Sequence, residues 1–233
     1  IKRKEKGLET LEDTPEEIKN IYNEVHYSSI NVLKKLSSKL IVYTIEGNLR
    51  ISTKSEVKEL EDKYNLNLDS TREKLKSIKN VKLVKNQVRN IKGLKIGFLD
   101  YFVDNSWINE FNEKDKEKIK EAKKETKKAK NILNRFGKSK IDILVCHQPP
   151  VGYLDKVNFP GVPKDWKGKH AGSKTILNFI KKYQPRYVFC GHIHEAKGKK
   201  KLGKTTIINA GCCGDYLIID TERDKILKSN FLK

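Results

Sequence analysis

Three short apolar runs of the chain are each followed by side chains that can bind a metal ion. The runs are residues 40–45, 141–146 and 187–190, and the side chains after them are Asn48, His147, and His192 with His194. Apolar runs of this length, bounded by turn-forming residues, are typical of buried strands. Because open α/β sheets bind ligands at the carboxyl ends of their strands, we expect these side chains to meet at one edge. Neutral imidazoles and an amide oxygen suit a divalent cation.

The local sequence favours this prediction at two of the strand ends. Gly191 lets the backbone turn sharply between the apolar run and His192. Pro149 and Pro150 stiffen the segment that leaves His147, and a stiff exit helps a ligand to keep its direction. Taken alone, two histidines so close in the sequence are equally consistent with a solvated surface pair.

The order of these motifs resembles that of the calcineurin-like metallophosphoesterases, in particular of the small archaeal and bacterial type. The motifs of that family are Asp-x-His, Gly-Asp, Gly-Asn-His followed by an acid, a strand-end His, and Gly-His-x-His. The matching residues, within a resemblance that covers about residues 39–220, are Gly47-Asn48, His147 with Gln148-Pro149-Pro150, and Gly191-His192-Ile193-His194. The resemblance implies an α/β fold, a four-layer αββα sandwich with mixed sheets, as a single domain over residues 1–233.

The resemblance also implies a metal site. Carried over residue by residue, one divalent cation would bind Asn48, His147 and His192, and a second cation would bind His194. Such ligands accept Mn, Fe, Zn or Ni, so the metal stays open. The implied reaction is hydrolysis of a phosphomonoester or a phosphodiester, in which two cations neutralise the phosphate and activate a water. We therefore expect two divalent metal ions as cofactors and a phosphoester as substrate.

The chain departs from the family pattern at its first motifs. Neither Asp-x-His nor Gly-Asp precedes Asn48, and Leu49 and Arg50 stand where the family has its catalytic His and an acid. The sequence starts at Ile1 and contains no Met. We expect that the natural beginning of the protein, with the first strand and both motifs, is missing here, and that phosphoesterase activity requires those residues.

His170 is the candidate for a catalytic side chain. It closes residues 151–170, a loop with several Gly and Pro residues that leaves directly from His147 and should overhang the metal site. The surrounding sequence matches a Gly-x-His-x-Gly-Ser pattern in relatives of the small archaeal and bacterial type, which implies a role on the substrate side. Because Leu49 replaces the family's His, we expect His170 or water to protonate the leaving group. The alternative is an ordinary surface histidine.

The net charge of the chain favours anionic partners. It is +20, from 50 basic and 30 acidic residues, although Lys-rich composition is also common in heat-adapted proteins. No basic motif has interleaved aromatic residues, so nucleic acid is a partner that we do not favour. The helix expected over about residues 110–136 places Lys and Glu at the spacing of a solvated face.

Two other function classes stay open. A binding scaffold, like a retromer subunit of similar fold that has lost its catalytic His, fits Leu49 and Arg50 but leaves the clustered imidazoles unexplained. A nuclease of the repair type would need DNA-binding segments, for which residues 112–136 are the candidate. No apolar run has the length of a membrane span, and the four cysteines lack metal-binding spacing. We therefore expect reduced thiols and a cytoplasmic protein of undefined oligomeric state.

The remaining elements follow from periodicity and turn residues. We expect helices over about residues 14–36, 55–65, 70–78 and 173–183, and strands over 81–84, 94–99, 205–209 and 216–220. Asn90 and Gly93 should form turns, and Gly137 should end the long helix. Asp100, Asp104 and Asn105 either approach the active cleft or are solvated loop residues.

Overall fold

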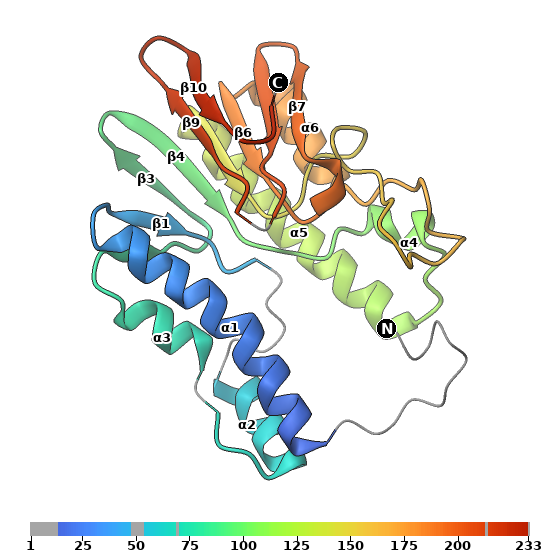
Figure 1. Ribbon diagram of the computed structural model, residues 1–233. Helices are drawn as coiled ribbons and strands as arrows, with labels where there is room; N and C mark the ends of the chain where they lie inside the picture. The colour runs from blue at the N-terminus through green and yellow to red at the C-terminus, as the bar shows by residue number, and fades with distance from the viewer. Residues whose placement is uncertain (1–13, 48–53, 69, 213, 233) are drawn as a thin grey trace. The chain divides into compact units, whose positions relative to one another are not determined.

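The computed structural model describes residues 14–47, 54–68, 70–212 and 214–232, which belong to two compact units, Ile1–Val84 and Lys85–Lys233. In Figure 1 the colours of the first unit run from blue to teal, and those of the second from green to red. Helices α1 and α5 have 23 residues each, but no helix in the described ranges is apolar enough to cross a bilayer.

The first unit combines helices with a pair of parallel strands. Its elements are α1 (Pro15–Ser37), β1 (Val42–Thr44), α2 (Lys54–Tyr64), α3 (Thr71–Ser77) and β2 (Val81–Leu83). α1 begins where the sequence predicts it. The side chain of Thr14 accepts a hydrogen bond from the N–H of Glu17, and the Glu17 carboxylate accepts one from the N–H of Thr14. β1 and β2 pair in parallel, with Val42 opposite Val81.

The second unit is built on a six-stranded mixed sheet. Its strands lie in the order β3 (Gln87–Ile91), β4 (Leu94–Leu99), β5 (Ile143–Cys146), β6 (Tyr187–Cys190), β8 (Thr205–Asn209) and β7 (Gly198–Leu202). The inner strands are parallel to one another, and the edge strands β3 and β7 are antiparallel to their neighbours. The carboxyl ends of β5 and β6 therefore lie side by side at one edge of the sheet.

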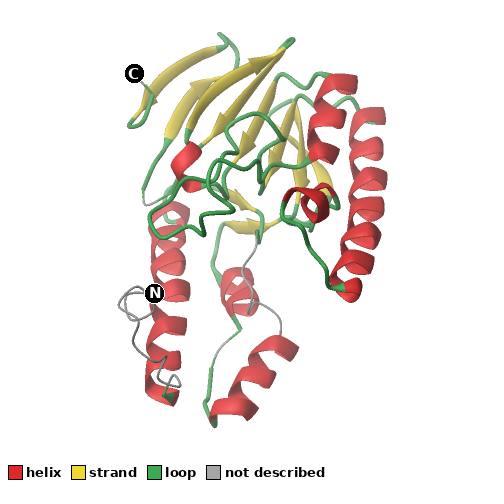
Figure 2. Cartoon of the chain, turned by 90° about the vertical axis from the view of Figure 1, so that its right-hand side faces the viewer, coloured by secondary structure: helices red, strands yellow, loops and turns green. Residues whose placement is uncertain are grey.

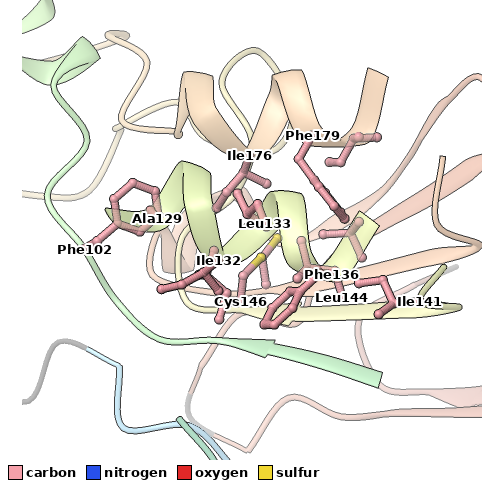
Figure 3. Packing of buried hydrophobic residues seen from close by; sticks show 14 of the residues in the cluster. Phe102, Ala129, Ile132, Leu133, Phe136, Ile141, Leu144, Cys146, Ile176 and Phe179 are labelled. Carbon is pink, nitrogen blue, oxygen red and sulfur yellow. The ribbon is translucent and has the colours of Figure 1, made fainter. Parts of the chain in front are cut away.

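Both faces of this sheet are covered, which explains why its inner strands are continuous apolar runs. Helices α5 (Lys116–Lys138) and α6 (Lys174–Tyr183) lie along one face (Figure 2), over a core that includes Phe136, Leu144 and Ile176 (Figure 3). The antiparallel pair β9 (Leu217–Asp220) and β10 (Lys225–Ser229) packs Leu217 and Ile219 against the other face. The α/β class with a central mixed sheet is confirmed, and this unit by itself has the helix, sheet and sheet layers of the predicted sandwich.

The long charged helix differs from its prediction at both ends. The segment before it forms a separate short helix, α4 (Ser106–Glu110), and α5 then starts after Asp115, whose side chain caps it. At the other end the helix continues through Gly137, where a Cβ atom would lie 2.4 Å from ring atoms of Tyr183. Gly137 therefore serves the close packing of α5 against α6, and it is not a helix terminator.

The predicted turn is confirmed at Gly93 and wrong at Asn90. Asn90 is part of strand β3, where it pairs with Lys95 of β4. The hairpin turn lies at Lys92 and Gly93, which both have positive φ angles. The polar residues of β3 hid this strand, because an edge strand needs few apolar side chains.

Asp104 connects the start of α4 to the start of α6. Its side chain is fully buried, and it accepts hydrogen bonds from the Ser173 hydroxyl at 2.5 Å, from the N–H of Thr175 at 3.1 Å and from the N–H of Ser106 at 2.9 Å. Asp104 is thus a buried structural residue and not a solvated loop residue. Its carboxylate also lies at the N-terminus of α6, where backbone N–H groups and the helix dipole favour a negative charge.

Gly97 of β4 tests how tightly α5 packs on the sheet. A Cβ atom there would lie 2.8 Å from Cδ2 of Phe136 and 2.8 Å from Cδ1 of Ile141, and both side chains are buried. We expect Gly97→Ala to lower the free energy of unfolding by about 1–3 kcal/mol, as overpacked cores do. Without the clash, alanine would be the better strand residue. Denaturant unfolding shows whether Gly97→Ala lowers or raises the free energy of unfolding. Adding Phe136→Leu in a double variant should recover part of the lost stability.

Asp104→Asn tests the connection between α4 and α6. Burial is the largest influence on the pKa of Asp104 and raises it, but the hydrogen bonds from Ser173, Ser106 and Thr175 together outweigh burial, so the pKa is lowered. A lowered pKa means that the carboxylate stabilises the fold above the ordinary value of 3.8 and stops doing so as the pH falls through its own lower pKa. We expect the variant to lose about 1–3 kcal/mol at neutral pH.

The difference between wild type and Asp104→Asn should shrink as the solution becomes acidic, measured by denaturant unfolding at several pH values. Asp165→Asn is the matched control, because Asp165 is exposed in a loop of the same unit. A difference that persists undiminished in acid would show that the charge of Asp104 does not stabilise this connection.

Candidate active site

His147 and His192 follow the ends of neighbouring parallel strands. His147 comes directly after β5, and His192 comes two residues after the end of β6. The N–H of Gly191 donates a hydrogen bond to the carbonyl oxygen of His147 at 2.9 Å, which continues the contact of the two strands beyond their ends. The side-chain amide of Gln148 donates to the carbonyl oxygen of Phe102 at 2.7 Å and holds the segment that leaves His147.

The two imidazoles face each other. Nε2 of His147 lies 3.0 Å from Nδ1 of His192, and the ring centres are 4.7 Å apart. Two aromatic side chains lie beside them: Tyr101 meets the ring of His147 edge-on at 5.6 Å, and Trp107 stacks near His192 at 6.4 Å. Nothing in the sequence marks either aromatic residue as a neighbour of the histidines, because both lie far from them along the chain.

Both imidazoles are held in their neutral form. Burial lowers the pKa of His147 to about 3, with smaller contributions from the charges of His192 and His194. Burial likewise lowers the pKa of His192, helped by His194 and opposed by Glu195. A metal binds the neutral imidazole, so this environment prepares the pair for a cation at neutral pH.

The backbone turn after β6 lies one residue later than the sequence suggested. His192 itself has a φ of +67°, in the left-handed region, whereas Gly191 does not. A non-glycine residue in that region costs on the order of 1–2 kcal/mol. Strain of this kind collects at functional sites, where the surrounding structure maintains it for the sake of side-chain direction.

Of the other predicted metal ligands, only His194 lies in the described part of the chain, and it does not join this pair. His194 is exposed and starts the short helix η2 (His194–Ala196), and it acts on the pair through its charge. Asn48 lies outside the described residues, together with Leu49 and Arg50. Within the described ranges no group of three or more His, Cys, Asp or Glu side chains is arranged to hold a metal ion.

The histidine pair nevertheless fits two ligands of one cation. Metal–nitrogen bonds of about 2.1 Å at a right angle separate two ligand atoms by about 3 Å. The two facing nitrogen atoms are 3.0 Å apart, and both rings are neutral. The same spacing allows a hydrogen bond between the rings when no cation is present.

His170 is paired with a buried carboxylate that sequence reasoning missed. Its Nδ1 lies 2.8 Å from Oδ1 of Asp155, a residue with only 2% of its surface exposed. The other oxygen of Asp155 accepts hydrogen bonds from the N–H groups of Gly152 and Gly172, at 2.9 and 3.1 Å. Nothing in the sequence marks Asp155, because the two residues lie 15 positions apart in an irregular loop.

The loop that carries His170 packs on the segment after His192. Val157 and Ala171 share a buried cluster with Ile193, which lies between the two histidines of the Gly-His-x-His motif. The N–H of Asn158 donates to the Glu195 carboxylate at 2.7 Å. The loop of residues 151–170 therefore lies against the segment that carries His192 and His194.

Comparisons with known proteins place the chain in a family. Residues 69–231, well over half of the chain, match a family model described as metallophosphoesterase of the calcineurin superfamily. An uncharacterised Methanocaldococcus jannaschii protein, MJ1162, is 29% identical over 204 residues, which are 87% of this chain and 78% of that protein. The human metallophosphoesterase domain-containing protein 1 is 42% identical over 74 residues, 31% of this chain and 21% of the human protein.

The matched segment thus spans about a fifth of the length of the human relative. Among solved structures, TT1561 of Thermus thermophilus is similar with a TM-score of 0.49 at 15% identity, over 90% of this chain and 79% of that one. With the family model extending over β2 to β10, the chain belongs to the metallophosphoesterases of the calcineurin superfamily.

Proposed function

We propose that the full-length protein is a metal-dependent phosphoesterase that hydrolyses phosphomonoesters or phosphodiesters. The observation that carries this proposal is the contact of two neutral imidazoles, 3.0 Å apart, at the ends of two parallel strands. Membership of the metallophosphoesterase family supports hydrolysis of a phosphoester as the reaction. When bound, a divalent cation would supply positive charge that neutralises the phosphate and makes water a better nucleophile.

In this proposal, each side chain of the site has a defined task. His147 and His192 hold the cation, and the neighbouring rings of Tyr101 and Trp107 limit the access of water to the imidazoles. His170 gives a proton to the leaving group. The departing oxygen otherwise carries a negative charge, and a positioned acid typically accelerates such a step about 10²–10⁴-fold.

The remaining ligands of the proposed site come from the sequence. Asn48 would complete the coordination of the first cation, and His194 would bind a second cation, which makes the centre dinuclear. The metal would be Mn, Fe, Zn or Ni, because His and Asn ligands suit all of them. The exposed side chains of Lys199, Lys200 and Lys201 lie on edge strand β7, which follows η2 in the chain, and their charge favours an anionic substrate.

Removal of either facing imidazole tests the metal site. We expect His147→Ala and His192→Ala to reduce both the metal bound per chain and the hydrolysis of model esters. The loss should exceed the roughly 10–100-fold that a missing supporting residue costs. Elemental analysis of the purified full-length protein gives the metal content, and release of p-nitrophenol from its phosphomonoester and phosphodiester gives the activity.

His26→Ala serves as the control, because His26 lies in α1 of the other compact unit and was not predicted to bind metal. His194→Ala distinguishes a mononuclear from a dinuclear centre, because it should remove one of the two cations only if the centre is dinuclear. If the full-length protein binds the metal but leaves both esters intact, a scaffold replaces the enzyme as the function. If the protein binds no divalent metal at all, the proposal of a metal site is wrong.

A further inference from the structure

The carboxylate of Asp155 makes more hydrogen bonds than anchoring the loop would require. Oδ2 alone ties the loop together, since it accepts hydrogen bonds from the N–H groups of Gly152 and Gly172. Oδ1 is left for Nδ1 of His170, at 2.8 Å. The side chain of Asp155 is 1% exposed, so water does not compete for these contacts. A buried carboxylate with one oxygen given wholly to an imidazole fixes that ring in place.

This contact also determines which nitrogen of His170 is available. An ionised carboxylate only accepts hydrogen bonds, so Nδ1 of His170 carries a proton and donates it toward Oδ1. Nε2 is then the nitrogen on the opposite side of the ring. The side chain of His170 is 38% exposed, in contrast to its partner, so the ring keeps one accessible side. An oriented imidazole with its second nitrogen accessible is the arrangement that proton transfer requires.

Helix α4 places His170 in the neighbourhood of the histidine pair. Trp107 and Glu110 are three residues apart, on one face of the helix. Trp107 stacks near the ring of His192, and its Nε1 donates to the carbonyl oxygen of Gly172 at 3.0 Å. Glu110 accepts a hydrogen bond from the backbone N–H of His170 at 3.1 Å. One helix face therefore contacts both His192 and the backbone around His170.

We propose that Asp155 is a positioning residue that orients His170, so that Nε2 of His170 protonates the leaving-group oxygen of the phosphoester. This inference rests on the proposed phosphoesterase function. In the reaction, the oxygen of water forms a bond to phosphorus, and the bond between phosphorus and the leaving-group oxygen breaks. His170 enters the step as the doubly protonated ring, with one proton on Nδ1 toward Asp155 and the other on Nε2. The leaving-group oxygen keeps the electron pair and takes the proton from Nε2, which leaves a neutral ring with its proton on Nδ1. A proton released by the attacking water then returns to Nε2, which restores His170.

The test compares two substrates of the metal-loaded full-length protein. One is a p-nitrophenyl phosphate ester, whose leaving group is stable as an anion and gains little from a proton. The other is an alkyl ester of the same phosphate, whose alkoxide leaving group needs one. We expect His170→Asn to slow cleavage of the alkyl ester about 10²–10⁴-fold and that of the p-nitrophenyl ester by less than about 10-fold. The Asn amide can still donate to Oδ1 of Asp155, so the loop keeps its anchor.

Asp155→Asn should reproduce the same selectivity with a smaller loss, because His170 remains but its orientation is no longer fixed. Asp165→Asn, the same chemical change at an exposed position of the same loop, should leave both substrates unaffected. Thermal unfolding and metal content of each variant show whether the fold and the metal site are intact. Equal losses on both esters in Asp155→Asn, or a loss that follows a lower melting temperature, would reduce Asp155 to a structural anchor and overturn the inference.

Failure of the inference differs visibly from failure of the proposed function. If wild-type protein cleaves both esters and the variants show no preference for the better leaving group, only the role of Asp155 and His170 is rejected. If wild-type protein with bound metal cleaves neither ester, the phosphoesterase proposal fails and the inference fails with it. A selective loss on the alkyl ester supports both.

Discussion

The candidate site depends on one consequence of parallel strand pairing. β5 and β6 are parallel neighbours, with Val145 opposite Phe189. The chain therefore leaves the sheet at the same edge after each of the two strands. Side chains that follow the two strands are therefore brought together although 45 positions separate His147 from His192. Partial burial at this edge lowers the pKa of both imidazoles. An antiparallel pairing of the same strands would have sent the two histidines to opposite ends.

Helix α4 contacts both His192 at this edge of the sheet and the backbone of His170. It is only five residues long and buries none of them, so it cannot be held by its own packing. Asp104 supplies the missing restraint, because its buried carboxylate binds the start of α4 and the start of α6 at once. Trp107 then reaches the ring of His192, and Glu110 reaches the backbone of His170. Asp104, for which the sequence left both a cleft position and a solvated loop position open, is thus a buried structural residue that positions α4.

The sequence predicts the elements with strong periodicity or clear caps and misses those held by distant contacts. The strands before His147 and His192 and the capped starts of α1 and α6 follow from local patterns, and the family resemblance adds their order. Strand β3 and helix α4 escape prediction because an edge strand and a one-turn helix have little apolar face. The partnership of Asp155 with His170 has no periodic spacing at all. Gly137 misled the prediction, since packing against Tyr183 and termination of a helix both favour glycine.

The histidines of this unit differ in what faces their ring nitrogens, and that difference separates the tasks that we propose for them. Nε2 of His147 faces another imidazole, in a partly buried place that opposes positive charge on either ring. Such rings keep a lone pair for a cation and are poor proton donors. Nδ1 of His170 faces a carboxylate instead, and its ring is partly exposed. A ring of that kind is fixed in orientation and keeps part of its surface accessible. In the proposed function, one kind of side chain would serve two purposes, because partial burial without a counter-charge favours metal binding, while a buried carboxylate beside an accessible ring favours proton transfer.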